Sequence, residues 1–153
     1  MAIETHVSDI THVIQLAVAP VFMLTAVGTI INALNSRLGR AVDRRRALEA
    51  RLAELSGDKA STAHEELAAI TRRIHYVYLS ILFAVLSGLF VCLLIAGAFL
   101  GAFVAIDLTR TVAALFVLAM LALIVCLLLF LREIFVAVSA PRHPAREASP
   151  RAP

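Results

Sequence analysis

A polar stripe in the first long apolar segment is the feature of this chain that could do chemistry. Segment 13–36 carries no charged residue, yet amide and hydroxyl side chains recur along it at helical spacing. The stripe comprises Gln15, Val18, Phe22, Thr25, Thr29, Asn32 and Ser36. At about 100° per residue, these positions fall on one side of a helix. Such a stripe could hydrogen-bond a neighbouring helix, or it could line a path for water and ions.

The two ends of the stripe differ in polarity. Val18 and Phe22 would form a hydrophobic constriction, which closes a pore by losing its water. Arg40 and Asp43 continue the same face beyond the segment and would form a mouth, although their opposite charges indicate no ion preference. Pro20 lacks a backbone N–H, so it predicts a kink beside the constriction.

Composition indicates which elements hold this stripe. The chain is 61% hydrophobic with a mean hydropathy of +0.90, whereas soluble domains are about 45–50% apolar. Uncharged segments at 13–36, 77–106 and 111–131 account for the excess, and about 20 helical residues cross a bilayer. We therefore predict an all-α integral membrane protein with three transmembrane helices. The residues before the first segment include Glu4 and Asp9 but no Lys or Arg, which is not typical of a signal peptide.

Basic residues predict the orientation. Of the 14 Lys and Arg residues, nine lie between the first two segments, four follow the third, and Arg110 alone lies between the second and third. Since Lys and Arg favour the cytoplasmic side, we expect the N-terminus outside and the C-terminus inside. The predicted parts are an extracytoplasmic segment at 1–12, membrane helices at 13–36, 76–106 and 112–131, a cytoplasmic helical hairpin at 37–75, an extracytoplasmic link at 107–111, and a mostly disordered cytoplasmic tail at 132–153.

The first two helices are expected to continue into the cytoplasm as an antiparallel coiled-coil hairpin. Apolar positions repeat with alternating four- and three-residue spacing, which is typical of a coiled-coil seam. The first seam occupies positions 34, 38, 41, 45, 48, 52 and 55, with Arg45 as its exception, and the second occupies 63, 67, 70, 74, 77 and 81. The turn is predicted at Ser56–Lys59. Thr62 and Glu65 then have the spacing of a helix-capping box.

Small residues predict close helix packing on the second membrane helix. Ser80, Ala84 and Gly88 recur every four residues, and Gly97 and Gly101 follow at the same spacing. Small side chains let helices approach closely in lipid. The second helix is therefore expected to be the central one.

The polar stripe needs a protein or water neighbour, because hydrocarbon cannot satisfy amides and hydroxyls. Neither of the other two helices offers a matching stripe, so copies of the first helix are the expected neighbours. A homo-oligomer with this helix along its axis follows. The axis is either a sealed polar core or an ion pore, and a contact within one subunit is the remaining arrangement.

The alternative function is a non-conducting scaffold. Its basic hairpin would bind cytoplasmic protein partners or anionic lipid, with Arg44, Arg45 and Arg46 close enough to the inner leaflet to contact headgroups. The basic residues are explained by membrane orientation, so no nucleic-acid partner is expected. Phosphate-loop, HExxH and CxxC motifs are missing from the sequence. The chain is therefore predicted to be a non-enzyme without cofactor or metal.

Residues 13–49 also resemble a family. Ile14, Gln15, Ala17, Ala19, Pro20, Val21, Phe22 and Leu24 fit an Ile-Gln-x-Ala-x-Ala-Pro-Val-Phe-x-Leu opening, and Arg37, Arg40, Asp43 and Arg44 fit a basic continuation. This pattern is similar to that of a bacterial family of uncharacterised three-span inner-membrane proteins, classed as a domain of unknown function. The resemblance implies a location in the bacterial cytoplasmic membrane and implies no activity.

Overall fold

The computed structural model consists of three long helices. It describes the backbone of residues 2–52, 56–104 and 107–139, and the side chains of 18–52, 56–57, 59–104 and 107–136. The helices are α1 (Ala2–Leu52), α2 (Asp58–Val104) and α3 (Thr109–Ser139). No strand occurs in these ranges, so the predicted all-α class is confirmed for them.

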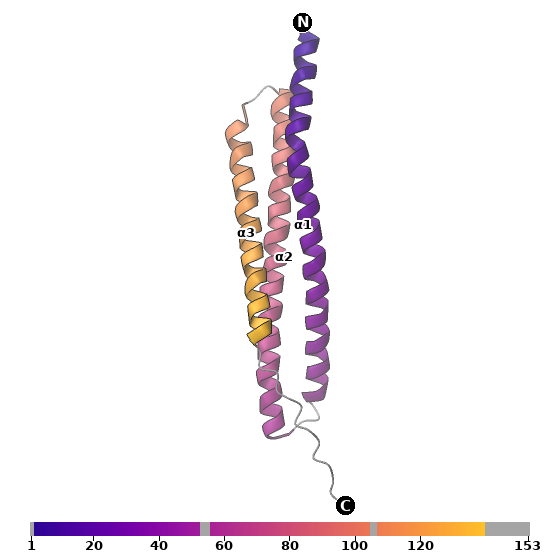
Figure 1. Ribbon diagram of the computed structural model, residues 1–153, viewed down its shortest axis with the longest axis vertical. Coiled ribbons are helices and arrows are strands. Elements are labelled where there is room, and N and C mark those ends of the chain that lie inside the picture. Colours follow the sequence, from indigo (N-terminus) through magenta and orange to yellow (C-terminus); the bar gives the residue numbers. More distant parts are fainter. Residues whose placement is uncertain (1, 53–55, 105–106, 140–153) are drawn as a thin grey trace, which may run out of the picture.

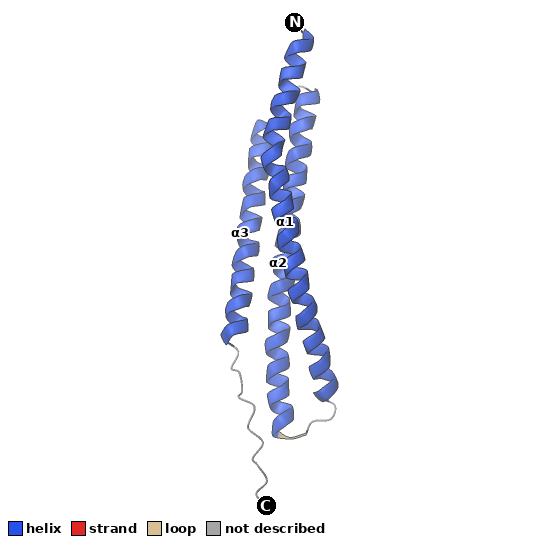
Figure 2. Ribbon diagram, turned by 45° about the vertical axis from the view of Figure 1, so that its right-hand side comes forward, coloured by secondary structure: helices blue, strands red, loops and turns tan. Residues whose placement is uncertain are grey.

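The three helices run side by side along the length of the molecule (Figure 1). α2 lies between α1 and α3 and packs against both. α1 and α2 continue past the end of α3 (Figure 2). We call the end of the molecule where α1 ends at Leu52 and α2 begins at Asp58 the hairpin end. The prediction that the second helix is central is confirmed.

The α1–α2 contact follows the two predicted seams. Every described position of both seams is buried or half-buried, including Arg45. Leu34 and Val77 are the most deeply buried of these residues, with relative exposures of 0% and 1%. Position 55 lies outside the described residues. The same register continues toward the other end of α1 at Val27 and Pro20, both buried, and α1 passes through Pro20 as a continuous helix. The predicted kink at Pro20 stays a prediction.

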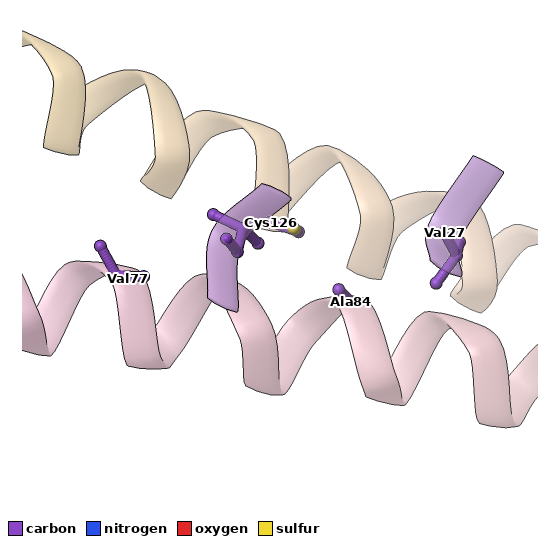
Figure 3. Packing of buried hydrophobic residues seen from close by; sticks show 5 residues of the cluster. Val27, Val77, Ala84 and Cys126 are labelled. Carbon is purple, nitrogen blue, oxygen red and sulfur yellow. The ribbon is translucent and has the colours of Figure 1, made fainter. Parts of the chain in front are cut away.

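All three helices meet around one apolar cluster. It contains Val27 and Leu34 of α1, Val77 and Ala84 of α2, and Cys126 of α3, and Figure 3 shows this cluster at close range. The small Ala84 is fully buried here, as its place in the small-residue pattern predicts. A larger side chain at this point would push the helices apart.

The other small residues divide between the two neighbours of α2. A Cβ atom added at Gly88 would lie 3.6 Å from Val27 Cγ1 of α1, and one added at Gly97 would lie 3.7 Å from Val112 Cγ2 of α3. Ser80 is buried and donates a hydrogen bond to the Tyr76 carbonyl within α2. Gly101 is half-buried. The stripe of small residues therefore serves two contacts rather than one.

Local signals set the starts of α2 and α3. Gly57 has a φ of 68°, a left-handed conformation that glycine adopts without strain, and its carbonyl accepts the N–H of Ala60 at 3.0 Å. α2 therefore begins at Asp58, before the predicted capping box at Thr62, because the turn itself caps the helix. At α3, Asp107 Oδ1 accepts the backbone N–H of Thr109 at 3.1 Å, satisfying a donor that the first helical turn leaves free.

Three stretches are long and apolar enough to cross a membrane: Val18–Leu52, Lys59–Val104 and Thr109–Val136. They indicate a multi-pass membrane protein. α3 differs from the prediction, because it continues through Ser139 rather than ending near residue 131. The predicted tail therefore starts with helix, and its remaining part, 140–153, lies outside the described residues. Residues 2–12 of the predicted N-terminal segment likewise belong to α1.

Candidate functional site

The polar stripe lies on the face of α1 that no other helix covers. All its described members, from Val18 to Ser36, are exposed. Phe22 is 71% exposed, more than any other large apolar side chain in the described ranges except Phe103 at 78%. The buried positions of α1, such as Val27 and Leu34, lie on the opposite side. The side chain of Gln15 lies outside the described residues. Neither α2 nor α3 supplies the neighbour that the stripe needs.

The hydroxyl groups of the stripe are bonded within α1. Thr29 Oγ1 donates to the Thr25 carbonyl at 3.0 Å, and Ser36 Oγ donates to the Asn32 carbonyl at 3.1 Å. Thr25 Oγ1 makes a longer contact of 3.4 Å to the Val21 carbonyl. Each hydroxyl oxygen still has lone pairs that can accept from water or bind a cation. The Asn32 carboxamide is exposed and has no hydrogen-bond partner among the described residues.

Arg40 and Asp43 continue this face toward the hairpin end. Both side chains are exposed, and neither forms an ion pair with any residue in the described part of the chain. They lie on one side of α1, three residues apart. The face therefore ends with one free positive and one free negative charge.

The three adjacent arginines of the hairpin differ in their partners. Arg44 Nε donates to Glu66 Oε1 of α2 at 3.2 Å, and Arg45 Nε donates to Glu49 Oε1 of α1 at 2.8 Å. Arg46 is exposed and has no such partner among the described side chains. Exposed ion pairs of this kind contribute little to stability, but they leave Arg46 as the arginine whose charge is least compensated.

A second site, which the sequence analysis missed, joins all three helices. Glu133 of α3 is fully buried. Its Oε2 accepts a hydrogen bond from Arg37 Nη1 of α1 at 3.0 Å, and its Oε1 accepts one from Arg73 Nε of α2. We call these three residues the carboxylate clamp. Both arginine side chains remain about a third exposed, at 29% and 35%.

Aromatic rings hold the guanidinium groups of this region. Arg37 Cζ lies 5.1 Å from the centre of the Phe130 ring on α3. Arg132 Cζ lies 5.3 Å from the Tyr76 ring on α2. A cation over a ring face within about 6 Å is attracted by the ring quadrupole. In the first contact, α1 supplies the arginine and α3 supplies the ring. In the second, α3 supplies the arginine and α2 supplies the ring.

The sequence did contain a signal for Glu133. Val112, Ala119, Cys126 and Glu133 are spaced by seven residues, and the last three are fully buried. Positions at this interval face the same neighbour in a coiled coil. The uncharged segment ends at Leu131, so Glu133 was predicted to lie in the tail. Its arginine partners could not be read from the sequence, because they depend on the relative heights of three helices.

No group of three or more His, Cys, Asp and Glu side chains within the described ranges could hold a metal ion. The one carboxylate buried there is the clamp residue Glu133.

The chain belongs to the family described as "Protein of unknown function (DUF2721)", which matches residues 17–143. This match covers the stripe from Val18 to Ser36, the carboxylate clamp and most of all three helices. No curated protein and no solved structure matches the chain.

Proposed function

We propose that this member of the family is a homo-oligomer of the bacterial cytoplasmic membrane in which α1 surrounds a central ion pore. One observation carries the proposal: a stripe with hydroxyl and carboxamide groups is exposed on a single chain, within a helix apolar enough to span a membrane. Hydrocarbon offers no hydrogen-bond partner to Asn32. A second copy of α1, or water between copies, would supply one.

The spacing of the stripe supports parallel self-association. From Val18 to Ser36 its members are four and three residues apart in alternation, which is the repeat of a left-handed helical bundle. Copies inserted with the same orientation meet in parallel, and the arginine-rich hairpin end of every copy would face the cytoplasm. In that arrangement, Arg40 of one copy lies near Asp43 of the next, and the two free charges neutralise each other.

A pore agrees with the order of side chains along this face. Thr25, Thr29 and Asn32 present oxygen atoms toward the axis, whereas Phe22 and Val18 narrow one end with apolar groups. A short apolar ring can exclude water and so close a pore without a moving plug. No catalytic role is part of the proposal.

Cysteine accessibility tests the proposal directly. Cys92 is exposed and is replaced by Ala, whereas Cys126 is fully buried and can remain. Single cysteines at Thr25, Thr29 and Asn32 are treated with a small charged thiol reagent in native membranes. Cysteines at Ala26 and Ala33 are matched controls, because both positions are also exposed on the single chain. Modification of the stripe positions alone is the expected result.

Protection of all five positions would indicate a sealed core or a closed constriction. Phe22→Ala distinguishes them, because it widens the constriction. In liposomes, this variant is expected to raise ion flux. A rise in flux while the cysteines at Thr25, Thr29 and Asn32 stay unmodified would be inconsistent with a pore along α1. Protection that persists in Phe22→Ala, together with unchanged flux, rejects the pore.

The projecting hairpin favours a second candidate function, a scaffold that binds a cytoplasmic protein or anionic lipid. α1 and α2 extend beyond the end of α3, so their outer surfaces are available there. Arg46 is the arginine best placed to make such a contact, since Arg44 and Arg45 have carboxylate partners. A photo-crosslinking residue at position 46 should then capture a protein or a lipid in cells, and the same residue at Ala33 should not capture it.

A further inference from the structure

We propose that the carboxylate clamp presents a phosphate-binding site on Arg37 and Arg73. The ligand is a phosphate group, either in the headgroup of an anionic lipid or as a soluble anion. This proposal does not depend on oligomerisation or conduction, because all its residues belong to one chain.

The clamp has more positive charge than it needs for its own carboxylate. Two guanidinium groups share one buried Glu133, which leaves a net charge of about +1 when all three are ionised. Each guanidinium has five N–H donors, and each donates one hydrogen bond to Glu133. No other described residue accepts a hydrogen bond from either group. Most of their donors are therefore available to an anion.

The guanidinium groups are also held in place before a ligand arrives. Glu133 fixes one side of each, and the Phe130 ring lies against Arg37. Arginine binds phosphate through parallel N–H groups, and a fixed guanidinium loses little freedom on binding. About a third of each arginine side chain is exposed, whereas Glu133 is fully buried. An anion that approaches from outside therefore reaches the arginines and not the carboxylate.

The depth of the clamp fits a lipid headgroup. Arg37 directly follows the uncharged segment 13–36, and Arg73 precedes the uncharged segment 77–106 by four residues. Both therefore lie at the polar edge of the membrane spans, where basic sites between helices bind anionic headgroups. Arg132 stands on the Tyr76 ring at the same edge and adds a third positive charge.

The test compares lipid binding by single variants of the full chain. Phosphatidylglycerol and phosphatidylcholine are titrated into protein in nonionic detergent, and retained lipid is measured by native mass spectrometry. In about 0.3 M ammonium acetate, general attraction between exposed charges is largely screened. Arg73→Gln and Arg37→Gln are each expected to weaken phosphatidylglycerol binding about tenfold, the effect of losing hydrogen bonds to a charged group. Each variant keeps one arginine on Glu133, so the fold is expected to survive.

Arg72→Gln is the matched control. It removes the same charge at the same depth of α2, but Arg72 is exposed and has no ion pair with a described residue. Its binding should change less than about twofold under these screened conditions. Equal losses in Arg72→Gln and Arg73→Gln would overturn the proposal, because they would show diffuse attraction rather than a site. Arg37→Lys keeps the charge without the planar donors and should fall between wild type and Arg37→Gln.

A second arm separates the two sources of phosphate. Inorganic phosphate is added to delipidated protein, and the midpoint of thermal unfolding is followed by circular dichroism. If phosphate raises the unfolding midpoint of wild type and Arg72→Gln but not of Arg73→Gln, the site binds a soluble anion. Selective lipid binding without that rise assigns it to a headgroup. Absence of both effects overturns the proposal.

Discussion

The two contacts of α2 are built on different principles. Its contact with α1 is a long run of apolar side chains, from Val27 to beyond Ala41, repeated at seven-residue intervals, and its polar bond Arg44–Glu66 is exposed. Its contact with α3 is also apolar in the middle, but specific polar bonds are added: Ser87 Oγ donates to the Ala119 carbonyl at 2.8 Å, and the clamp joins Arg73 to Glu133. Repeated apolar contacts tolerate a shift of one heptad, whereas point-to-point bonds do not. The position of α3 along α2 is therefore set by its polar groups.

The largest expected effect comes from the clamp. Glu133→Gln removes the charge between two arginines, and breaking a buried ion pair costs about 3 kcal/mol. The low end of the usual range applies, because both guanidinium groups are partly exposed. Unfolding of the variant in bicelles, compared with wild type, measures the loss.

Glu49→Gln is the control for that variant, because it breaks an exposed pair with Arg45 within α1. Its free energy of unfolding should change by less than about 0.5 kcal/mol. If the two glutamine variants were equally stable, Glu133 would not fix the position of α3.

An apolar contact is expected to matter less. Leu34 is fully buried between α1 and α2, and Leu34→Ala should cost about 2 kcal/mol, mainly through the cavity it leaves. Moving the Leu34 side chain from lipid into the helix contact contributes little free energy, because lipid is as apolar as the protein interior. The same bicelle measurement applies. If Leu34→Ala lowered the free energy of unfolding more than Glu133→Gln does, the apolar contact would contribute more to stability than the clamp.

Ser87→Ala tests the middle of the α2–α3 contact. Removing a single interhelical hydrogen bond in a membrane protein costs about 0.6 kcal/mol. Ser80→Ala is its internal control, because Ser80 is equally buried but donates within its own helix. Ser80→Ala should therefore be nearly neutral in the same assay. Equal losses would mean that burial, rather than the bond between helices, explains the effect.

The smallest effect is expected at the start of α3. The hydrogen bonds that Thr109 donates to Asp107 lower the pKa of this carboxyl from its usual value of 3.8. A lowered pKa stabilises the fold above the usual value, and this stabilisation is lost as the pH falls through the lowered one. The midpoints of thermal unfolding of wild type and Asp107→Asn should therefore differ by a small constant amount near neutral pH. The two midpoints should converge as the pH falls below 3.8. A difference that grows on acidification would contradict this sign.

The sequence predicted the helices and the α1–α2 contact because both depend on local periodicity. Leu34, Leu38 and Ala41 face α2 as their spacing requires, and Gly57 forms the turn that its neighbours indicate. Periodicity also predicted that the Thr25–Asn32 face would differ from the opposite face, although the role of that face stays a prediction.

The end of α3 was missed, and the arginine partners in the clamp could not be predicted from periodicity. Hydropathy places the boundary at the first charged residue, and Arg132 and Glu133 come directly after Leu131. A buried carboxylate is tolerated only where positive partners reach it. Those partners lie 96 and 60 residues away in sequence, and only the packing of three helices brings them together.

The order of synthesis gives the clamp a further consequence. A ribosome completes α1 and α2 before it reaches α3, so Arg37 and Arg73 enter the membrane without their shared carboxylate. Two uncompensated arginines at the edge of a nascent hairpin remain near the surface, and arrival of Glu133 draws them together. The last helix to be made therefore closes the structure, and a chain released before residue 133 keeps both arginines without the carboxylate that pairs them.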